Sequence, residues 1–212
     1  MKTFLERVHK QPNSKKAKIL TVARKIFGEY GFHGATTRMI AKESGIDVST
    51  LYYHWGEKAY LYEAVVLDVN EDLKKKFFEI EKIIHGLPLA QRMELSIDII
   101  TDYLFEHPEI TNVILSRYFV KIRHQASQDI HVPEYISNIA YSMGLSKKRK
   151  PVSQQFKMQV LAIMNTIHTF VSGTNSFCGS LNINKKDYIA LAKETLRFIL
   201  IPAFTNPQSK GD

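Results

Sequence analysis

Apolar residues recur at intervals of three and four along most of the chain, which is the spacing of helices that bury one face. Residues 15–30 show this clearly, because an apolar stripe lies between a capping Ser14 and a terminating Gly31. The stripe consists of Ile19, Leu20, Ala23, Ile26 and Phe27. No stretch alternates apolar and polar residues between turn signals, as a half-buried strand would. The pattern therefore predicts an all-α fold.

Glycine, proline and capping residues divide this pattern into about nine helices. Breaks are marked by glycines such as Gly45 and Gly86 and by prolines such as Pro108 and Pro151. The helices are expected at residues 15–30, 37–44, 48–54, 58–84, 89–106, 109–126, 133–143, 153–177 and 185–201.

Residues 36–55, TTRMIAKESGIDVSTLYYHW, predict two short helices joined by a tight turn. Gly45 gives the turn its backbone freedom, and Ile46 can fill the small core beneath both helices. Asp47 can accept hydrogen bonds from the free amides at the start of the second helix. This pattern is typical of a helix-turn-helix, whose second helix can enter the major groove of DNA with its first residues near the bases.

The side chains around this motif suit contacts with DNA. Val48, Ser49 and Thr50 lead the second helix and can approach base edges, whereas Leu51 is expected in the core. At the start of the first helix, hydroxyls and free amides can bind phosphate oxygens, and an arginine can reach a phosphate or a base edge. These residues are Thr36, Thr37 and Arg38.

The residues at the end of the second helix and at the start of the next one have two possible roles. Tyr53, His54 and Lys58 are expected to clamp the flanking phosphates, because a three-helix unit is too small to bury every aromatic side chain. The alternative is an aromatic mini-core, and this interpretation is favoured for Tyr52 and Trp55.

The charge distribution favours a polyanionic partner for this end of the chain. The 212 residues carry a formal charge of +8. Residues 1–58 hold eleven Lys and Arg against five Asp and Glu, which is +6 of that total. A basic end on a nearly neutral body suits nucleic acid, although a solvated basic face without a partner has the same composition. No apolar run has the length of a membrane span and no secretory signal is present, so a cytoplasmic location is expected.

Residues 16–66 resemble the N-terminal domain of TetR-family (tetracycline-repressor-like) transcriptional regulators. The residues in family register are Ile19-Leu20, Ala23, Phe27, Gly31-Phe32, Thr36-Thr37, Ile40-Ala41, Gly45-Ile46, Thr50-Leu51-Tyr52, Trp55, Lys58 and Leu61. The resemblance implies a homodimer that places two recognition helices in successive major grooves of a near-palindromic operator, usually as a repressor. It also implies a divergent C-terminal domain whose small-molecule ligand weakens DNA binding.

The same resemblance implies which residues contact phosphates and bases. They are Thr37, Arg38, Val48, Ser49, Thr50, Tyr53, His54 and Lys58. Val48 stands where a polar or basic side chain is common, and it is suited to apolar contact with a thymine methyl group. Trp55 replaces the usual Phe, and Glu57 stands where a Ser or Asn cap is common; neither departure threatens the assignment.

These observations predict two domains. Residues 1–62 form the DNA-binding domain, of which 1–13 are expected to be a flexible basic arm, and residues 63–212 form an effector-binding and dimerisation domain. The last two long helices have broad apolar faces that could build a four-helix interface with a second copy of the chain. The alternative is that both faces are buried within one subunit.

A ligand pocket is expected among the middle helices, lined by apolar side chains with a few polar groups. The candidate lining residues are Tyr103, Tyr118, Phe119, Ile122, Tyr141, Asn165 and His168. Asn165 and His168 would be polar anchors on an otherwise apolar helix, although such residues are more often satisfied core groups. The aromatic and aliphatic lining favours a fairly apolar ligand.

The sequence lacks signals for catalysis, metals and cofactors. The eight histidines include no pair at the spacing of a helical metal site, and the single Cys178 cannot form an internal disulfide. No glycine-rich phosphate loop or nucleophile elbow occurs. The sequence therefore favours a ligand-responsive, homodimeric DNA-binding repressor over an enzyme. The alternative left open is a DNA-binding regulator whose C-terminal domain is a protein-interaction and dimerisation scaffold without a small-molecule effector.

Overall fold

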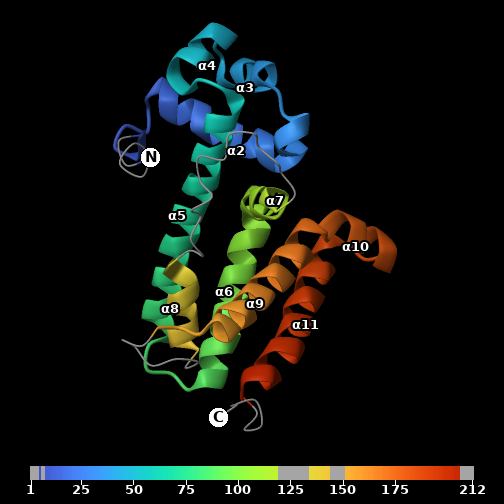
Figure 1. Ribbon diagram of the computed structural model, residues 1–212. Coiled ribbons are helices and arrows are strands. Elements are labelled where there is room, and N and C mark those ends of the chain that lie inside the picture. The colour runs from blue at the N-terminus through green and yellow to red at the C-terminus, as the bar shows by residue number, and fades with distance from the viewer. Residues whose placement is uncertain (1–4, 6–7, 119–133, 144–150, 206–212) are drawn as a thin grey trace. The chain divides into compact units, whose positions relative to one another are not determined.

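The computed structural model describes residues 5, 8–118, 134–143 and 151–205, and within them the chain forms helices and no strands (Figure 1). The expected all-α fold is therefore confirmed. The helices with defined bounds in these residues are α2 (Lys15–Gly34), α3 (Thr37–Ser44), α4 (Val48–Trp55), α5 (Lys58–Ile84), α6 (Leu89–Glu106), α7 (Pro108–Arg117), α8 (Glu134–Ser142), α9 (Gln154–Ser172), α10 (Thr174–Leu181) and α11 (Lys185–Thr205).

Two expected helices differ clearly from the observed ones, and α2 and α11 end four residues later than expected, at Gly34 and Thr205. The single helix expected over 153–177 is interrupted at Gly173, so that α9 ends before this residue and α10 begins after it. The ring of Phe177 lies where a Cβ at Gly173 would be, so the missing side chain gives this ring its space at the break between the two helices. The helix expected over 109–126 is α7, which ends at Arg117; residues 119–126 lie outside the described part of the chain.

The chain divides into two compact units. The first consists of residues 1–73 and 108–128, and the second of residues 74–107 and 129–212. The first unit therefore contains α2, α3, α4, α7 and α5 up to Leu73. The predicted boundary after residue 62 separates a DNA-binding domain from an effector-binding domain. The division into compact units does not test this boundary, which stays a prediction.

The first unit is built on the predicted apolar stripe of α2. Ile19 and Phe27 are fully buried, and the Phe27 ring meets the ring of Tyr62 on α5 edge-on with 5.0 Å between centroids. Burying each such side chain stabilises the fold by about 1.5–3 kcal/mol. At Gly31 the backbone has φ +66°, a conformation that only glycine adopts readily. α2 is therefore kinked at Gly31, where the sequence predicts the end of a helix, and it continues to Gly34.

The N-terminal segment corrects the expectation of a flexible arm over residues 1–13. Leu5 and Val8 are buried, with 3% and 4% of their surface exposed. Nε2 of His9 lies 2.6 Å from Oδ1 of Asp68 on α5. The two apolar residues are three positions apart, which is a helical spacing that the interpretation as an arm overlooked. The described part of this segment therefore packs onto the first unit.

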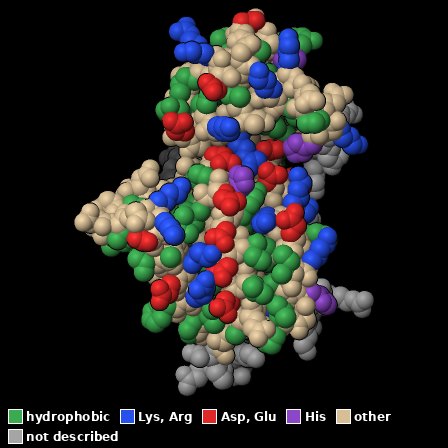
Figure 2. Space-filling view, turned by 180° about the vertical axis from the view of Figure 1, so that it is seen from behind, with side chains coloured by type: hydrophobic (Ala, Val, Ile, Leu, Met, Phe, Trp, Pro, Cys, Tyr) green, Lys and Arg blue, Asp and Glu red, His purple; other side chains and the backbone are tan. Residues whose placement is uncertain are grey.

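The second unit buries apolar side chains of α6, α9 and α11. Its fully or nearly fully buried residues include Ile97, Leu104, Ile167 and Leu196. At the surface, Arg197 Nε donates to Oδ1 of Asp98 at 3.1 Å, and Lys193 Nζ donates to both carboxylate oxygens of Asp102 at 2.8 Å. Acidic and basic side chains are interleaved on this part of the surface in Figure 2. Such exposed pairs add little stability but align α11 with α6.

The described helices contain neither a membrane span nor a metal centre. None of them combines the length and the apolar character needed to cross a bilayer. Nor does this part of the chain gather three or more His, Cys, Asp or Glu side chains in a group able to hold a metal ion. Cys178, in α10, is a free thiol that is partly exposed.

Candidate nucleic-acid interface

The turn between α3 and α4 is fixed by capping hydrogen bonds. Thr36 caps α3, since its hydroxyl oxygen accepts a backbone N–H from the first turn at 3.1 Å. The helix ends at Gly45, whose φ of +68° and ψ of 38° cost a glycine little. The amides of Gly45 and Ile46 donate to the carbonyls of Lys42 and Ala41, each at 3.0 Å. These bonds satisfy the end of α3 and determine where α4 begins.

Asp47 organises the first turn of α4. Its Oδ1 accepts the amide of Thr50 at 2.7 Å and the hydroxyl of Ser49 at 2.5 Å, and its Oδ2 accepts the hydroxyl of Thr50 at 2.9 Å. The Ser49 hydroxyl and the Thr50 amide and hydroxyl hold the pKa of this carboxyl well below its usual range. Both hydroxyls therefore donate to Asp47 and keep their oxygen lone pairs available as acceptors.

α4 has one anchored face and one exposed face. Leu51 is fully buried and Trp55 is 7% exposed, with its indole Nε1 donating to the carbonyl of Lys16 on α2 at 3.3 Å. Tyr53 is 85% exposed and Tyr52 is 48% exposed. The expected aromatic mini-core is thus confirmed for Trp55 and wrong for Tyr52. Residues 51 and 55 share a helical face, whereas position 52 is turned about 100° away from residue 51.

The structure brings the nine predicted DNA-contacting residues into one stretch of the first unit, from the start of α3 to the start of α5. The exposed ones are Thr36, Arg38, Ser49 and Tyr53, and the partly exposed ones are Thr37, Val48, Thr50, His54 and Lys58. The rings of Tyr53 and His54 meet edge-on with 5.2 Å between centroids. None of the nine is fully buried, and their contacts with DNA stay predictions.

Lys58 has a structural role that the sequence did not reveal. Its Nζ donates to the carbonyl of Phe32 at 2.8 Å and to that of Ala35 at 3.0 Å. The ammonium group also lies 4.5 Å from the centre of the Phe32 ring, and burial lowers its pKa. Lys58 therefore holds the end of α2 and the segment before α3, and it has one N–H left for a phosphate.

The candidate ligand-binding residues are distributed over both units. Tyr103, Tyr141, Asn165 and His168 belong to the second unit, whereas Tyr118 belongs to the first and is 57% exposed. Phe119 and Ile122 lie outside the described residues. The predicted pocket therefore stays a prediction.

Two of these candidates have well-defined surroundings. The Lys76 ammonium lies 5.1 Å from the centre of the Tyr103 ring, and the His107 ring is 4.8 Å from it. His168 is 2% exposed, and burial lowers its pKa to about 4. His168 is therefore neutral at neutral pH.

The helices α2, α3 and α4 of the first unit form a helix-turn-helix domain. α2 supports α4, and a capped turn joins α3 to a helix whose first turn is polar and exposed. Residues 19–65 match the family described as "Bacterial regulatory proteins, tetR family". This domain of the chain belongs to the TetR family.

Named proteins resemble the chain over different lengths. The chain is 33% identical over 82 residues to the HTH-type transcriptional regulator UidR of Escherichia coli strain K12. The matched residues make up 39% of this chain and 42% of UidR, so the chain matches less than half of that relative. It is 23% identical over 129 residues to the HTH-type transcriptional repressor AcnR of Corynebacterium glutamicum, covering 56% of this chain and 69% of AcnR.

The fold is similar over a longer part of the chain. The structure of a TetR-like transcriptional regulator from Rhodococcus sp. RHA1 superposes with a TM-score of 0.57 at 18% identity. The match covers 87% of this chain and 93% of that protein. A TetR-like fold therefore includes most of both units.

Proposed function

We propose that the protein is a sequence-specific DNA-binding transcriptional repressor that acts as a homodimer in the cytoplasm. The proposal depends on the two faces of α4: Leu51 and Trp55 anchor it, and Ser49 is exposed in its first turn. A helix held in this way can enter the major groove with its first turn beside the bases. The tetR family match and the similarity to the repressor AcnR support this function.

The first turn of α4 favours particular bases. The hydroxyls of Ser49 and Thr50 donate to Asp47, so toward DNA they act as acceptors. The donors in the major groove are the exocyclic amines of adenine and cytosine. Val48 precedes them and suits a thymine methyl group. We therefore expect adenine or cytosine opposite the two hydroxyls and thymine beside Val48.

The flanks of α4 suit the phosphate backbone. Arg38 and Tyr53 are exposed on either side of the capped turn, and Thr37 is partly exposed at the start of α3. Lys58 contributes one N–H, because its other two already bind carbonyls. These contacts position the domain on the duplex without reading its sequence.

A second copy of the chain is expected on α11. This helix buries Tyr188 and Leu196 within its own unit but exposes Leu191, Phe198 and Ile199, at 47%, 78% and 48%. Leu191 and Phe198 are seven residues apart and therefore share a face. An exposed apolar stripe of this kind is typical of a subunit interface. A dimer would present two copies of α4 to a near-palindromic operator.

We also propose that a small, fairly apolar ligand bound by the helices of the second unit releases the repressor from DNA. Four of the candidate lining residues belong to that unit. His168 is almost fully buried, as a core group would be, and this observation favours the second candidate function. That candidate is a regulator whose body is a scaffold without an effector.

The test is selection of bound duplexes from a random DNA pool, with and without small molecules extracted from cells. We expect enrichment of a two-fold symmetric sequence and its loss with one fraction of the extract. Failure of the wild-type protein to enrich any duplex at low salt would exclude the DNA-binding function. Enrichment that no fraction changes would favour the scaffold.

A further inference from the structure

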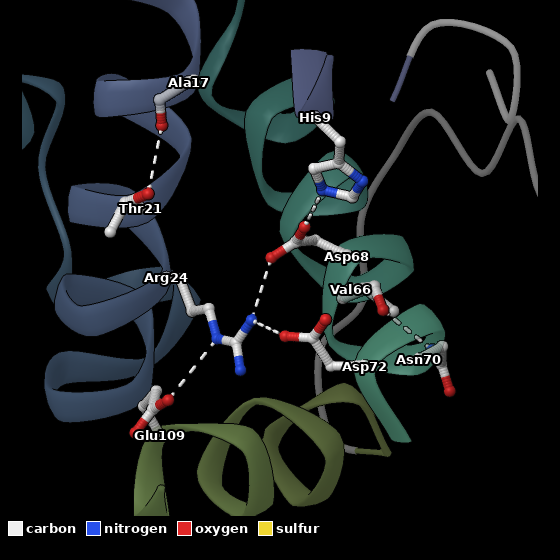
Figure 3. A network of polar contacts seen from close by, with 9 residues as sticks. All are labelled: His9, Ala17, Thr21, Arg24, Val66, Asp68, Asn70, Asp72 and Glu109. Carbon is white, nitrogen blue, oxygen red and sulfur yellow. Dashed lines mark hydrogen bonds and ion pairs between the residues drawn. The ribbon is translucent and has the colours of Figure 1, made fainter. Parts of the chain in front are cut away.

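Arg24 of α2 is the centre of a polar cluster in the first unit (Figure 3). Its Nη1 donates to Oδ2 of Asp72 at 2.5 Å and to Oδ2 of Asp68 at 3.0 Å, both on α5. Its Nε lies 3.5 Å from Oε1 of Glu109, the second residue of α7. Asp68 also binds His9 of the N-terminal segment at 2.6 Å. These five residues, the Arg24 cluster, join four parts of the chain around an arginine side chain that is 14% exposed.

The ion pair between Arg24 and Glu109 is the weakest connection of the cluster. It is the longest of the three contacts to carboxylates, and within the described part of the chain Arg24 Nε makes no hydrogen bond. Three carboxylates surround one guanidinium, so they repel one another while each is attracted to the same cation. Because Asp68 and Asp72 would keep the guanidinium paired, Glu109 can separate from Arg24 without leaving a buried charge alone.

α2 and α7 also meet at an unusually close backbone contact. A methyl group at Gly28 of α2 would lie 2.7 Å from Cβ and 2.8 Å from Cα of Glu109. Real carbon atoms do not approach so closely, so any side chain at Gly28 would move the two helices apart. Glu109 therefore contacts α2 twice, through its carboxylate and through its backbone.

We propose that Glu109 is a positioning residue for DNA binding, through which α7 determines the placement of α2 and hence of α4. The inference rests on the proposed function, because its readout is DNA binding. α4 follows α2 because Trp55 is bonded to the carbonyl of Lys16. The chain enters the second unit within α5, after Leu73, and returns to the first directly before α7. A rearrangement in the second unit can thus reach α2 at the contact between Glu109 and Gly28.

The Arg24 cluster has two arrangements, and a change from one to the other would transmit a movement of α7 to α2. In one state Glu109 is paired with Arg24 and packed on Gly28, as observed. In the other, α7 has moved away and the α5 carboxylates alone hold Arg24. A packed contact of this kind switches between arrangements rather than deforming gradually.

The experiment uses the full-length protein and the duplex that the wild-type protein selects, together with duplexes whose half-site separation is changed by one or two base pairs. We expect Gly28→Ala to lower affinity for the selected duplex about tenfold or more and to shift the preferred separation by about one base pair. Glu109→Gln keeps the side chain's shape and removes its charge, and it should shift the preference in the same direction with a smaller loss.

Matched controls carry the same chemical changes elsewhere. Gly179→Ala places a methyl group in open space, and Glu106→Gln changes an exposed carboxylate; both should stay within about twofold of the wild-type protein. Affinity lost equally at every separation would indicate simple destabilisation and would overturn the inference, as would wild-type affinity for both variants. If Gly28→Ala does not fold, Glu109→Gln alone decides. A wild-type protein that binds no duplex would overturn the proposed function, and the inference with it.

Discussion

α4 and α11 are both anchored by buried side chains, yet they expose opposite kinds of residue. α4 exposes the hydroxyl of Ser49 and the phenol of Tyr53, whereas α11 exposes Leu191, Phe198 and Ile199. Hydroxyl groups can exchange water for phosphates and bases in a wet groove, while apolar groups gain free energy only where water is excluded. The comparison supports the proposed function, in which a polar surface binds DNA and an apolar surface binds a second subunit.

The largest expected effect comes from placing a charge on the apolar interface. Phe198→Glu should give a monomer, because a carboxylate at the centre of an apolar interface would be desolvated without a partner. Affinity for a symmetric operator should fall about a thousandfold, since the two half-sites would no longer be bound as one. Light scattering should change from about twice 24.4 kDa to 24.4 kDa. Phe198 is 78% exposed, so the fold of each subunit should survive.

Lys186→Glu is the matched control, because it places the same side chain at an exposed polar position in the first turn of α11. It should leave both mass and affinity near their wild-type values. A dimer that persists in Phe198→Glu would contradict the assignment of α11 as the subunit interface and would remove one half of the comparison.

The two regions also differ in how much of them could be predicted from sequence. The helix-turn-helix was predictable because its determinants are local: Gly45, Asp47 and Leu51 lie within one short stretch and act on their neighbours. The sequence predicted only a phosphate contact for Lys58 and no role for Arg24. In both cases the partners are distant in sequence. The carbonyls of Phe32 and Ala35 leave no trace in side-chain pattern, and Arg24 meets carboxylates from two other helices. Long-range pairing of this kind requires the fold.

The next effect concerns a polar group that points into the second unit instead of out of it. Burial lowers the pKa of His168 to about 4 from an ordinary value of 6.5, so the unfolded chain binds a proton that the folded chain resists. Stability from this group is complete above pH 6.5 and is lost as pH falls toward 4. The free energy of unfolding should decrease by about 3 kcal/mol over that range.

Denaturant titrations at several pH values would measure this effect as a difference from His168→Gln, which cannot titrate. His85→Gln, at an exposed position, should keep the wild-type dependence. Parallel curves for the wild-type protein and His168→Gln would show that His168 is not held neutral by the core.

A smaller effect separates two residues on the DNA side. Lys58→Ala should lower stability by about 1–2 kcal/mol, because two carbonyls lose a charged donor, and should also weaken DNA binding. Tyr53→Ala should leave stability unchanged, since the side chain is 85% exposed, while weakening binding to every duplex several-fold. Thermal unfolding and binding across salt concentrations would measure both. Unchanged affinity of the Tyr53 variant at all salt concentrations would refute its phosphate contact.

The smallest effect tests whether the exposed face of α4 reads bases. Ser49→Ala removes one hydroxyl that donates to Asp47, and Asp47 still caps the helix by accepting the amide of Thr50. We expect preference for adenine or cytosine at one operator position to weaken by about 1 kcal/mol, with affinity for unrelated duplexes unchanged. Repeating the selection with this variant would reveal the position, and the two-fold symmetry of a dimer requires the same change in both half-sites. An unchanged preference would mean that α4 contacts only the backbone there, which would leave Val48 and Thr50 as its base-reading side chains.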